Sequence, residues 1–207
     1  MNSSLRRGRS AAIVLSIGCF AYSFATSPAS AATVSISSGT VIAGGATTVS
    51  LNVLGLGGGT ALGAYDVTVA FDQSLLSFAS ASYGDPLLGD QLDLEGFGTI
   101  SGTTPDAGTT EFFELSLDSS EALLASQATS FTLATLTFNG VATGVSPLTL
   151  SINSIGDQDG NALSTSLQNG SLQVDAAPVP LPAAIWLLAS ALGSLGFGVR
   201  PRFVAND

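Results

Sequence analysis

Apolar and polar residues alternate with a period of two through most of the chain between residues 32 and 174. The clearest segment runs from Tyr65 to Asp72, where tyrosine, valine, valine and phenylalanine occupy every second position. Successive side chains of a strand point to opposite faces of a sheet, so this alternation predicts a strand with one buried face. We therefore expect the side chain of Tyr65 to be buried.

Seven further segments show a comparable pattern, and clusters of Gly, Ser, Asn and Asp separate them. They are residues 34–36, 49–53, 75–78, 113–117, 131–138, 148–152 and 170–174. The apolar positions of the segment 131–138 change phase between Leu133 and Leu136, as a β-bulge or a central strand buried on both faces would produce. Eight or nine short strands separated by turns predict an all-β fold, a β-sandwich that occupies residues 32–175.

Two stretches depart from the alternation. Residues 84–109 are rich in Gly, Asp, Thr and Pro, but they also contain the large apolar residues Leu87, Leu88, Leu92, Leu94, Phe97 and Ile100. A structureless loop of this length is uncommon in a compact domain, so we expect the segment to fold back over the sheets or to contain short strands. Residues 119–127 form the one plausible helical turn of the domain, with Ser119 or Ser120 as its N-cap.

An uncharged segment, residues 183–199, lies near the C-terminus between Pro182 and the arginines Arg200 and Arg202. A helix of this length spans about 25 Å, slightly less than a hydrocarbon core of about 30 Å, and can still cross a bilayer. Proline is tolerated at the first helical position, so the helix is expected to begin at Pro182. The two arginines keep residues 200–207 in the cytoplasm. The pattern predicts a single C-terminal transmembrane helix.

The tail as a whole resembles the PEP-CTERM sorting signal, which exosortases process in bacteria that export extracellular polysaccharide. Residues 176–182 form a linker and the sorting motif, which reads Val179-Pro180-Leu181-Pro182. A helix start and a short arginine-containing stop follow in the family's order. Leu181 stands where the family name has a glutamate, and the residues after Arg202 make the ending longer than usual. The resemblance implies cleavage by an exosortase near residues 179–182, and an uncleaved membrane anchor is the alternative.

The N-terminus has the three parts of a secretory signal peptide, which we assign to residues 1–31. A cluster of three arginines precedes an apolar run, and Ala29-Ser30-Ala31 forms an A-x-A cleavage site. The apolar run of about 14 residues is short for a transmembrane helix, which is the alternative. Lipid attachment at Cys19 explains the region less well than the small-residue site does. We expect cleavage after Ala31 and export of the domain through the inner membrane.

The charge distribution excludes several classes of function. The net charge is −10, all five cations lie in the terminal segments, and the chain has no His. A domain without cations cannot neutralise phosphates, so nucleic-acid binding is excluded. Without histidine there is no Ser/His/Asp nucleophile system. The only cysteine, Cys19, lies in the signal peptide, so the mature domain has neither a disulfide nor thiol chemistry.

Paired carboxylates, as in glycosidases, are the one catalytic chemistry that this composition leaves. The nearest clusters are Glu111 with Glu114, and Asp90 with Asp93 and Glu95. The domain contains no Arg, Lys, His or Trp to accompany them. Solvated acids on turns and outer faces are therefore the simpler interpretation, and we expect no catalytic residue and no enzyme activity.

Asp157, Asp159 and Asn161 have the spacing of the first oxygen ligands in calcium-binding loops. A glycine stands at the fourth position of this segment, however, and a calcium loop has it at the sixth and a glutamate at the twelfth. An Asx-rich turn is therefore the better interpretation. A loosely bound calcium ion is the alternative, and no other cofactor is expected.

The order of strands and turns resembles that of cohesin domains. The matching segments are residues 62–72, 75–78, 131–138, 160–161 and 169–174. The resemblance implies a jelly-roll sandwich of about nine strands, related in architecture to some carbohydrate-binding modules, whose typical role is to dock a partner module. No dockerin, catalytic module or second cohesin is visible in this chain.

Together these patterns predict an exported, non-enzymatic protein of the cell surface or the extracellular polysaccharide matrix. Its expected partners are an exosortase, the membrane through the C-terminal helix, and either a dockerin-like module or polysaccharide. A carbohydrate-binding module is the alternative, and it would require an exposed aromatic platform built from Tyr65, Tyr83 or a phenylalanine. A glycosidase acting through Glu111 and Glu114 is the third possibility.

Overall fold

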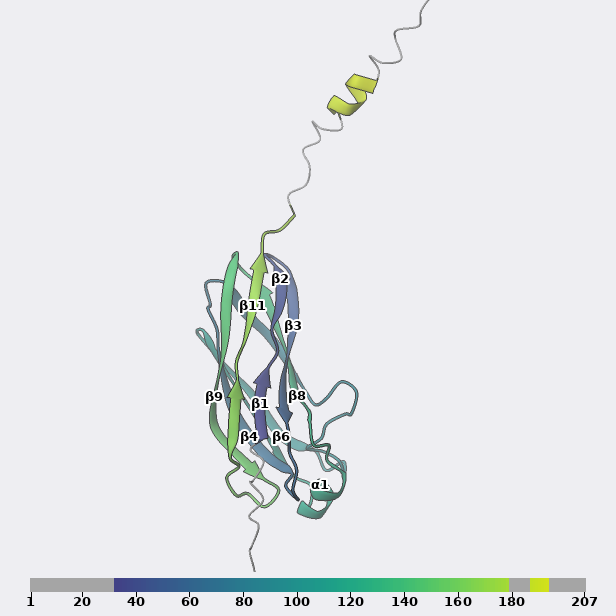
Figure 1. Ribbon diagram of the computed structural model, residues 1–207, viewed down its shortest axis with the longest axis vertical. Helices are drawn as coiled ribbons and strands as arrows, with labels where there is room; N and C mark the ends of the chain where they lie inside the picture. The colour runs from purple at the N-terminus through teal and green to yellow at the C-terminus, as the bar shows by residue number, and fades with distance from the viewer. Residues whose placement is uncertain (1–31, 179–186, 194–207) are drawn as a thin grey trace, which may run out of the picture.

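The computed structural model describes residues 32–178 and 187–193. Two β-sheets pack face to face, and the short helix α1 (Ser120–Ser126) lies at one end of them (Figure 1). The five-stranded sheet has the order β10 (Thr165–Gln168), β1 (Ala32–Ile36), β3 (Ala46–Leu54), β8 (Phe131–Gly140) and β5 (Leu76–Tyr83). The six-stranded sheet has the order β2 (Gly39–Ile42), β11 (Gly170–Asp175), β9 (Gly144–Asp157), β4 (Leu62–Ala70), β7 (Thr109–Ser116) and β6 (Thr99–Asp106). The predicted all-β sandwich is confirmed.

The difference between the expected nine strands and those observed arises at the first and last segments of the domain. β1 and β2 belong to one extended run that leaves one sheet after Ile36 and joins the other at Gly39. β10 and β11 divide their run at Asn169 in the same way. β1 pairs with β10 and β2 pairs with β11, in both cases in parallel. The beginning and the end of the domain therefore lie side by side in both sheets.

A β-bulge explains the phase change in β8. Leu51 of β3 pairs with Ala134, and the next residue, Asn52, pairs with Thr132, so Leu133 is the extra residue. Leu133 and Ala134 are both buried. Of the two explanations expected from the sequence, the bulge is therefore present, and β8 also lies between two neighbours in its sheet.

The inward side chains of both sheets form one continuous core. In β4, Tyr65 is 2% exposed and Val67 is completely buried, as the alternation predicts. The ring of Phe138 meets those of Phe71 and Phe78 edge to face, with centroid distances of 5.2 and 5.7 Å. Edge-to-face pairs are the favoured arrangement of aromatic rings. Phe71 follows β4 and Phe138 belongs to β8, so the first pair joins the two sheets.

The strand β7 has the opposite orientation to the one that its apolar residues suggest. Phe113 and Leu115 share one face, as the alternation predicts, but this is the outer face, where Leu115 is 44% exposed. Phe112 and Glu114 point into the core and are 0% and 1% exposed.

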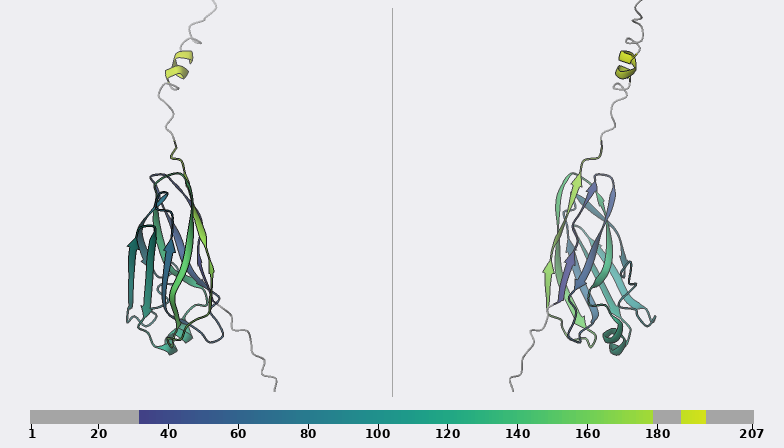
Figure 2. Two further views of the ribbon diagram at one scale, coloured as in Figure 1. Left: turned by 90° about the vertical axis from the view of Figure 1, so that its left-hand side faces the viewer. Right: turned by 45° about the vertical axis from the view of Figure 1, so that its right-hand side comes forward.

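The helix α1 confirms the predicted helical turn and its cap. The Ser119 side chain accepts a hydrogen bond from the backbone N–H of Ala122, which satisfies one of the free donors at the helix start. Leu123 anchors the helix against the sandwich and is 2% exposed. Figure 2 shows α1 at the end of the sandwich that is opposite the end of β11.

Several predictions about the termini concern residues outside the described ranges. The signal peptide with its site at Ala29 and Ala31, the motif 179–182, and Arg200 and Arg202 all lie there, so those predictions stay untested. Residues 187–193, within the predicted membrane helix 183–199, are helical and exposed. Among the described residues, no helix has both the length and the apolar character that crossing a bilayer requires.

Candidate functional site

The outer face of the six-stranded sheet places residues of three strands in register. Directly opposite residues of an antiparallel pair point to the same side, so each row of partners can be read from the pairing. We define the β4–β7–β6 face by three such rows. They are Ala64, Leu115 and Ile100; Asp66, Phe113 and Gly102; and Thr68, Glu111 and Thr104.

The apolar part of this face lies toward the α1 end of the sandwich. Ile100 is 53% exposed and lies opposite Leu115. The ring of Phe113 lies over Gly102, since a Cβ atom built at Gly102 would approach its ring carbons to 2.6 Å. The missing side chain at Gly102 therefore lets an aromatic ring lie on the sheet next to two exposed aliphatic residues.

The polar part of the face is organised by Asn153. The amide nitrogen Nδ2 of Asn153 donates to Asp66 Oδ1 at 2.9 Å and to Thr68 Oγ1 at 3.0 Å, and it lies 3.4 Å from Glu111 Oε1. Asn153 is the extra residue where β9 shifts register against β4, which directs its side chain onto this face. One amide thus connects acidic side chains of two strands. Because residues 32–178 contain no cation, this end of the face is acidic.

The catalytic pair considered from the sequence is not assembled. Glu111 lies on the outer face of β7 and Glu114 lies on the inner face, so the sheet separates them. The acids of the second cluster bind backbone instead. Asp93 Oδ1 accepts from the N–H of Gly98 at 2.8 Å, and Glu95 Oε2 accepts from the N–H of Ser119 at 2.8 Å.

Glu114 has a different neighbour from the one that the sequence suggested. Tyr65 donates to Glu114 Oε2 at 3.1 Å, and Thr99 donates to Glu114 Oε1 at 2.9 Å. Burial raises the pKa of Glu114 to about 7, and the negative charge of Asp90 adds to this effect. Glu114, Tyr65 and Thr99 thus form a polar cluster on the inner side of the six-stranded sheet, and the β4–β7–β6 face lies on its outer side.

The candidate calcium loop is a self-contained turn. Asp157 Oδ1 accepts from the backbone N–H of Asp159 at 2.9 Å and from that of Asn161 at 2.8 Å. Partial burial alone would raise the pKa of Asp157, but the hydrogen bonds from Asn161, Asp159 and Gly160 lower it on balance. Among the described residues, no group of three or more His, Cys, Asp or Glu is placed to hold a metal. The geometry matches the Asx-rich turn.

The hydroxyl groups of both tyrosines in the domain form hydrogen bonds within the fold. Tyr65 is buried against Glu114, as described above. Tyr83 donates to the carbonyl oxygen of Gly102 and lies 2.8 Å from Thr103 Oγ1, which joins β5 to β6. Neither ring offers the flat exposed platform on which a sugar could stack.

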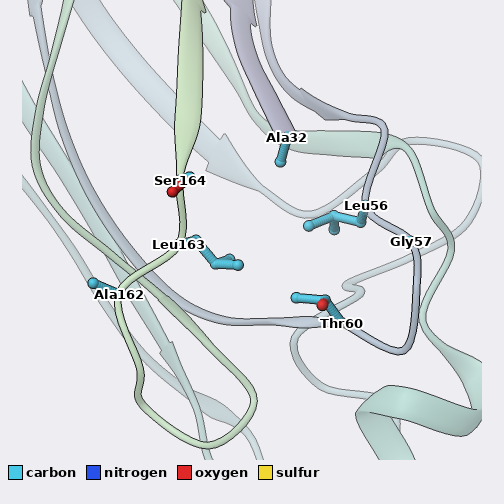
Figure 3. A pocket seen from close by; sticks show the side chains of 7 residues that line it. All are labelled: Ala32, Leu56, Gly57, Thr60, Ala162, Leu163 and Ser164. Carbon is cyan, nitrogen blue, oxygen red and sulfur yellow. The ribbon is translucent and has the colours of Figure 1, made fainter. Parts of the chain in front are cut away.

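A small hollow of about 210 Å³ lies at the end of the sandwich where β1 begins (Figure 3). The side chains of Ala32, Leu56, Thr60 and Leu163 point toward it. Its lining contains two hydroxyl groups and no ionisable side chain. It therefore offers shape but little chemistry for recognising a ligand.

Comparisons with known proteins identify the architecture. No protein-family model matches the chain, and no curated protein matches it either. Several solved structures match its fold. A non-cellulosomal cohesin from the archaeon Archaeoglobus fulgidus aligns over 76% of this chain and 97% of its own, with 14% identity and a TM-score of 0.53. The sixth cohesin of scaffoldin B from Acetivibrio cellulolyticus, solved in complex with a dockerin, aligns over 70% of this chain and 99% of its own, with 17% identity and a TM-score of 0.56.

The domain has a cohesin-like fold. A cohesin module from a family 33 glycoside hydrolase of Clostridium perfringens also aligns over 99% of its length, with 13% identity and a TM-score of 0.54. Each alignment spans nearly the whole module, so the likeness concerns the complete sandwich. The resemblance seen in the strand order is thus confirmed at the level of the fold.

The sequence patterns single out Glu111 and the segment 113–117 but do not group them into a face. Ile100 lies in an irregular segment, and Asn153 belongs to no apolar pattern. The one available signal was the pair Phe112-Phe113, which shows that β7 carries aromatic residues on both faces. A strand that is apolar on both sides has either a second packing layer or an exposed apolar face.

Proposed function

We propose that the cohesin-like domain is a non-enzymatic protein-docking module whose partner is a dockerin-like module. The observation that carries the proposal is an outward-facing apolar group on an ordered sheet face, formed by exposed Ile100 and Leu115 and half-buried Phe113. Two solved cohesins of this fold are described in complex with dockerins, one from Acetivibrio cellulolyticus and one from Clostridium thermocellum. Support therefore comes from the fold and from a surface suited to binding.

The β4–β7–β6 face also defines the chemistry of the partner. Apolar side chains of the partner would cover Ile100 and Leu115, and burying such side chains supplies most of the binding free energy. Basic or donor groups of the partner would lie over Asp66 and Glu111, because the domain has no cation of its own to neutralise them. A partner with an apolar centre and a basic edge fits both halves of the face.

The mature protein, immobilised and exposed to secreted proteins of its source cells, tests the docking proposal. A captured protein that carries a dockerin-like module would then be titrated by calorimetry. Leu115→Lys places a charge in the apolar group, and we expect it to weaken binding at least about 30-fold, the effect of losing about 2 kcal/mol. Leu54→Lys is the matched control, since Leu54 is 40% exposed on the other sheet. Equal binding by both variants would place the interface elsewhere.

We further propose that the domain is exported, held at the envelope by its tail, and transferred to the cell surface or matrix by an exosortase acting near residues 179–182. This part of the proposal is motivated by the arginine-flanked terminal segments and the resemblance of the tail to the PEP-CTERM signal. Carbohydrate binding is the alternative function. The buried or bonded tyrosines of the described domain do not favour it, and hits on a glycan array would restore it.

A further inference from the structure

The two sheets of the sandwich differ in charge. The strands of the five-stranded sheet, β10, β1, β3, β8 and β5, contain no charged residue. All acids of residues 32–178 lie in the six-stranded sheet, in α1 or in the connections. Because like charges repel each other at close range, another acidic molecule can approach this domain most easily along the five-stranded sheet.

The sandwich has four sheet edges, and three of them carry features that oppose pairing with another strand. β2 and β10 have only four residues each. β6 contains Pro105 and ends at the acid Asp106. Short edge strands, prolines and charged side chains are devices by which proteins prevent edge-to-edge association. These three edges are therefore poor sites for adding a strand.

The fourth edge, β5, is long and uncharged. Its eight residues, Leu76–Tyr83, include neither proline nor a charged side chain, and β8 is its only partner in the sheet. Its one irregularity is a bulge at Ala79, where the pairing with β8 shifts by one residue. The side chains of Ser77, Ser80 and Ser82 are exposed. The backbone groups along the outer side of such a strand are a template for a further strand.

A protruding leucine follows the end of β5. Leu87 is 93% exposed, and the next residue, Leu88, is 54% exposed. Asp85 Oδ1 accepts from the N–H groups of both leucines, at 2.8 and 3.0 Å. Asp85 Oδ2 accepts from the N–H of Thr132 in β8 at 2.8 Å. The turn that presents Leu87 to solvent is therefore fastened to the strand next to β5.

A hollow of about 280 Å³ lies at the start of β5. Its lining comes from β5, from the segment after β4 and from the β6–β7 turn: Leu76, Ser77 and Phe78; Phe71 and Gln73; and residues 105–108. Phe71 and Phe78 both meet the buried ring of Phe138 edge to face, which holds the aromatic walls in place. A cavity of about 150 Å³ can bind benzene, so this hollow has room for a leucine side chain.

We propose that β5 pairs antiparallel with β5 of a second copy of this chain about a two-fold axis, and that Leu87 of each copy enters the hollow of the other. Such an axis brings the end of each strand beside the start of its partner. With Ser80 near the axis, Tyr83 lies opposite Ser77. Leu87 follows Tyr83 by four positions and Gln73 precedes Ser77 by four, so the leucine and the hollow meet beyond the same end of the strand pair.

The arrangement of charge and shape favours a second copy over an unrelated strand. The protruding leucine and the hollow flank the same strand at opposite ends, which is the self-complementarity that a two-fold interface requires. β5 and its neighbour β8 are uncharged, so their copies form one continuous sheet without bringing acids of these strands together. The β4–β7–β6 face belongs to the other sheet and stays free, so the proposal does not depend on the docking function.

Sedimentation equilibrium of the mature protein at concentrations up to about 1 mM tests the proposal. We expect a reversible equilibrium between monomer and dimer that added salt strengthens, because salt screens the repulsion between two acidic copies. Leu87→Asp should weaken dimerisation at least about tenfold, since it removes the side chain that enters the hollow. Leu54→Asp is the matched control, because Leu54 is 40% exposed on the interior strand β3 of the same sheet.

A second pair of variants tests the pairing of the strands. Ser80→Asp would place two like charges near the axis, and like charges on opposite residues destabilise a strand pair. We therefore expect it to weaken dimerisation as well. Thr48→Asp adds the same charge in the same row of side chains, since Ser80 and Thr48 both pair with Thr137. Thr48 belongs to the interior strand β3, so this control should dimerise as the wild type does.

Four results would overturn the proposal. They are a monomer over the whole concentration range, an association that continues beyond the dimer, a dimer that persists unweakened in either Leu87→Asp or Ser80→Asp, and equal weakening by a control variant. All variants carry the same termini. Association through the tail would therefore appear as a dimer that none of these substitutions weakens.

Discussion

Carboxylate side chains hold the loops of this domain by accepting hydrogen bonds from backbone N–H groups. Asp85 binds the N–H groups of Leu87, Leu88 and Thr132, and Asp118 binds those of Leu94 and Glu95. The hydrogen bond from Thr132 is the largest of the effects that lower the pKa of Asp85. Residues 32–178 contain no cation, so backbone donors take the place that ion pairs occupy in other proteins. These anchors are strongest when the acids are ionised, which is the opposite of the behaviour of Glu114.

The side chain of Tyr83 joins the two sheets at their edges. Its hydroxyl group donates to Gly102 and bonds to Thr103, which ties β5, an edge strand of one sheet, to β6, an edge strand of the other. Tyr83→Phe should lower the free energy of unfolding by about 1–2 kcal/mol, the usual value for losing a partly buried hydrogen bond and leaving its acceptor unpaired. Urea denaturation of the mature protein measures this. Ser101→Ala, at an exposed neighbouring position of β6, should have no comparable effect.

The element β7 shows how far the sequence predicts this fold. Segments with a clean alternation, such as residues 65–71, predict the correct buried face. Residues 113–117 alternate equally well, yet their apolar side chains face outward. Periodicity reports that residues share a face and does not report which face is buried. When a strand has a buried glutamate on its inner side, as β7 has at position 114, hydrophobicity alone points to the wrong side.

The remaining strands were harder to predict for other reasons. β6 contains Gly102 and Pro105 among threonines, so it lacks an apolar period, and it sits at the edge of its sheet, where proline is tolerated. β2 and β10 have only four residues each. The hydrogen bond from Ser116 to the Leu92 carbonyl oxygen joins a strand and a loop that no local pattern connects. The β4–β7–β6 face was not predictable because it depends on register between strands.

The helix α1 carries two adjacent leucines that differ in burial. Leu123 is 2% exposed and Leu124 is 46% exposed. Leu123→Ala should lower the free energy of unfolding by about 2–4 kcal/mol, because it removes buried methyl groups and leaves a cavity. Leu124→Ala should change it by less than about 0.5 kcal/mol. Chemical denaturation followed by circular dichroism measures both, and equal effects would show that the helix does not pack as described.

The molecule as a whole has a directional layout. β11 ends at one end of the sandwich, and α1 lies at the other (Figure 1). Leu115 stands near the end of β7, and α1 begins soon after it at Ser120, so the apolar group around Leu115 lies toward the α1 end. A tail that held the domain at a membrane would therefore attach at the end away from this group. In that arrangement the apolar part of the β4–β7–β6 face would point away from the membrane.

The processing of the two termini is tested by the mass of the intact mature protein. We expect a chain that begins at Ala32 and ends within residues 179–182, because the signal peptide and the tail helix would both have been removed. A mass that extends to Asp207 would show that the tail is a permanent anchor. Deleting the exosortase gene should produce that longer form and leave the N-terminus unchanged, which separates the two cleavage events.

The parallel pairing of β1 with β10 and of β2 with β11 has a consequence for resistance to proteolysis. β1 lies between β10 and β3, and β11 lies between β2 and β9, so the first and last strands of the domain are both interior strands. An exopeptidase that trims the chain from either terminus would meet a strand that is hydrogen-bonded to a neighbour on both sides. Trimming of the flanking segments should therefore stop at β1 and β11 and leave the sandwich intact.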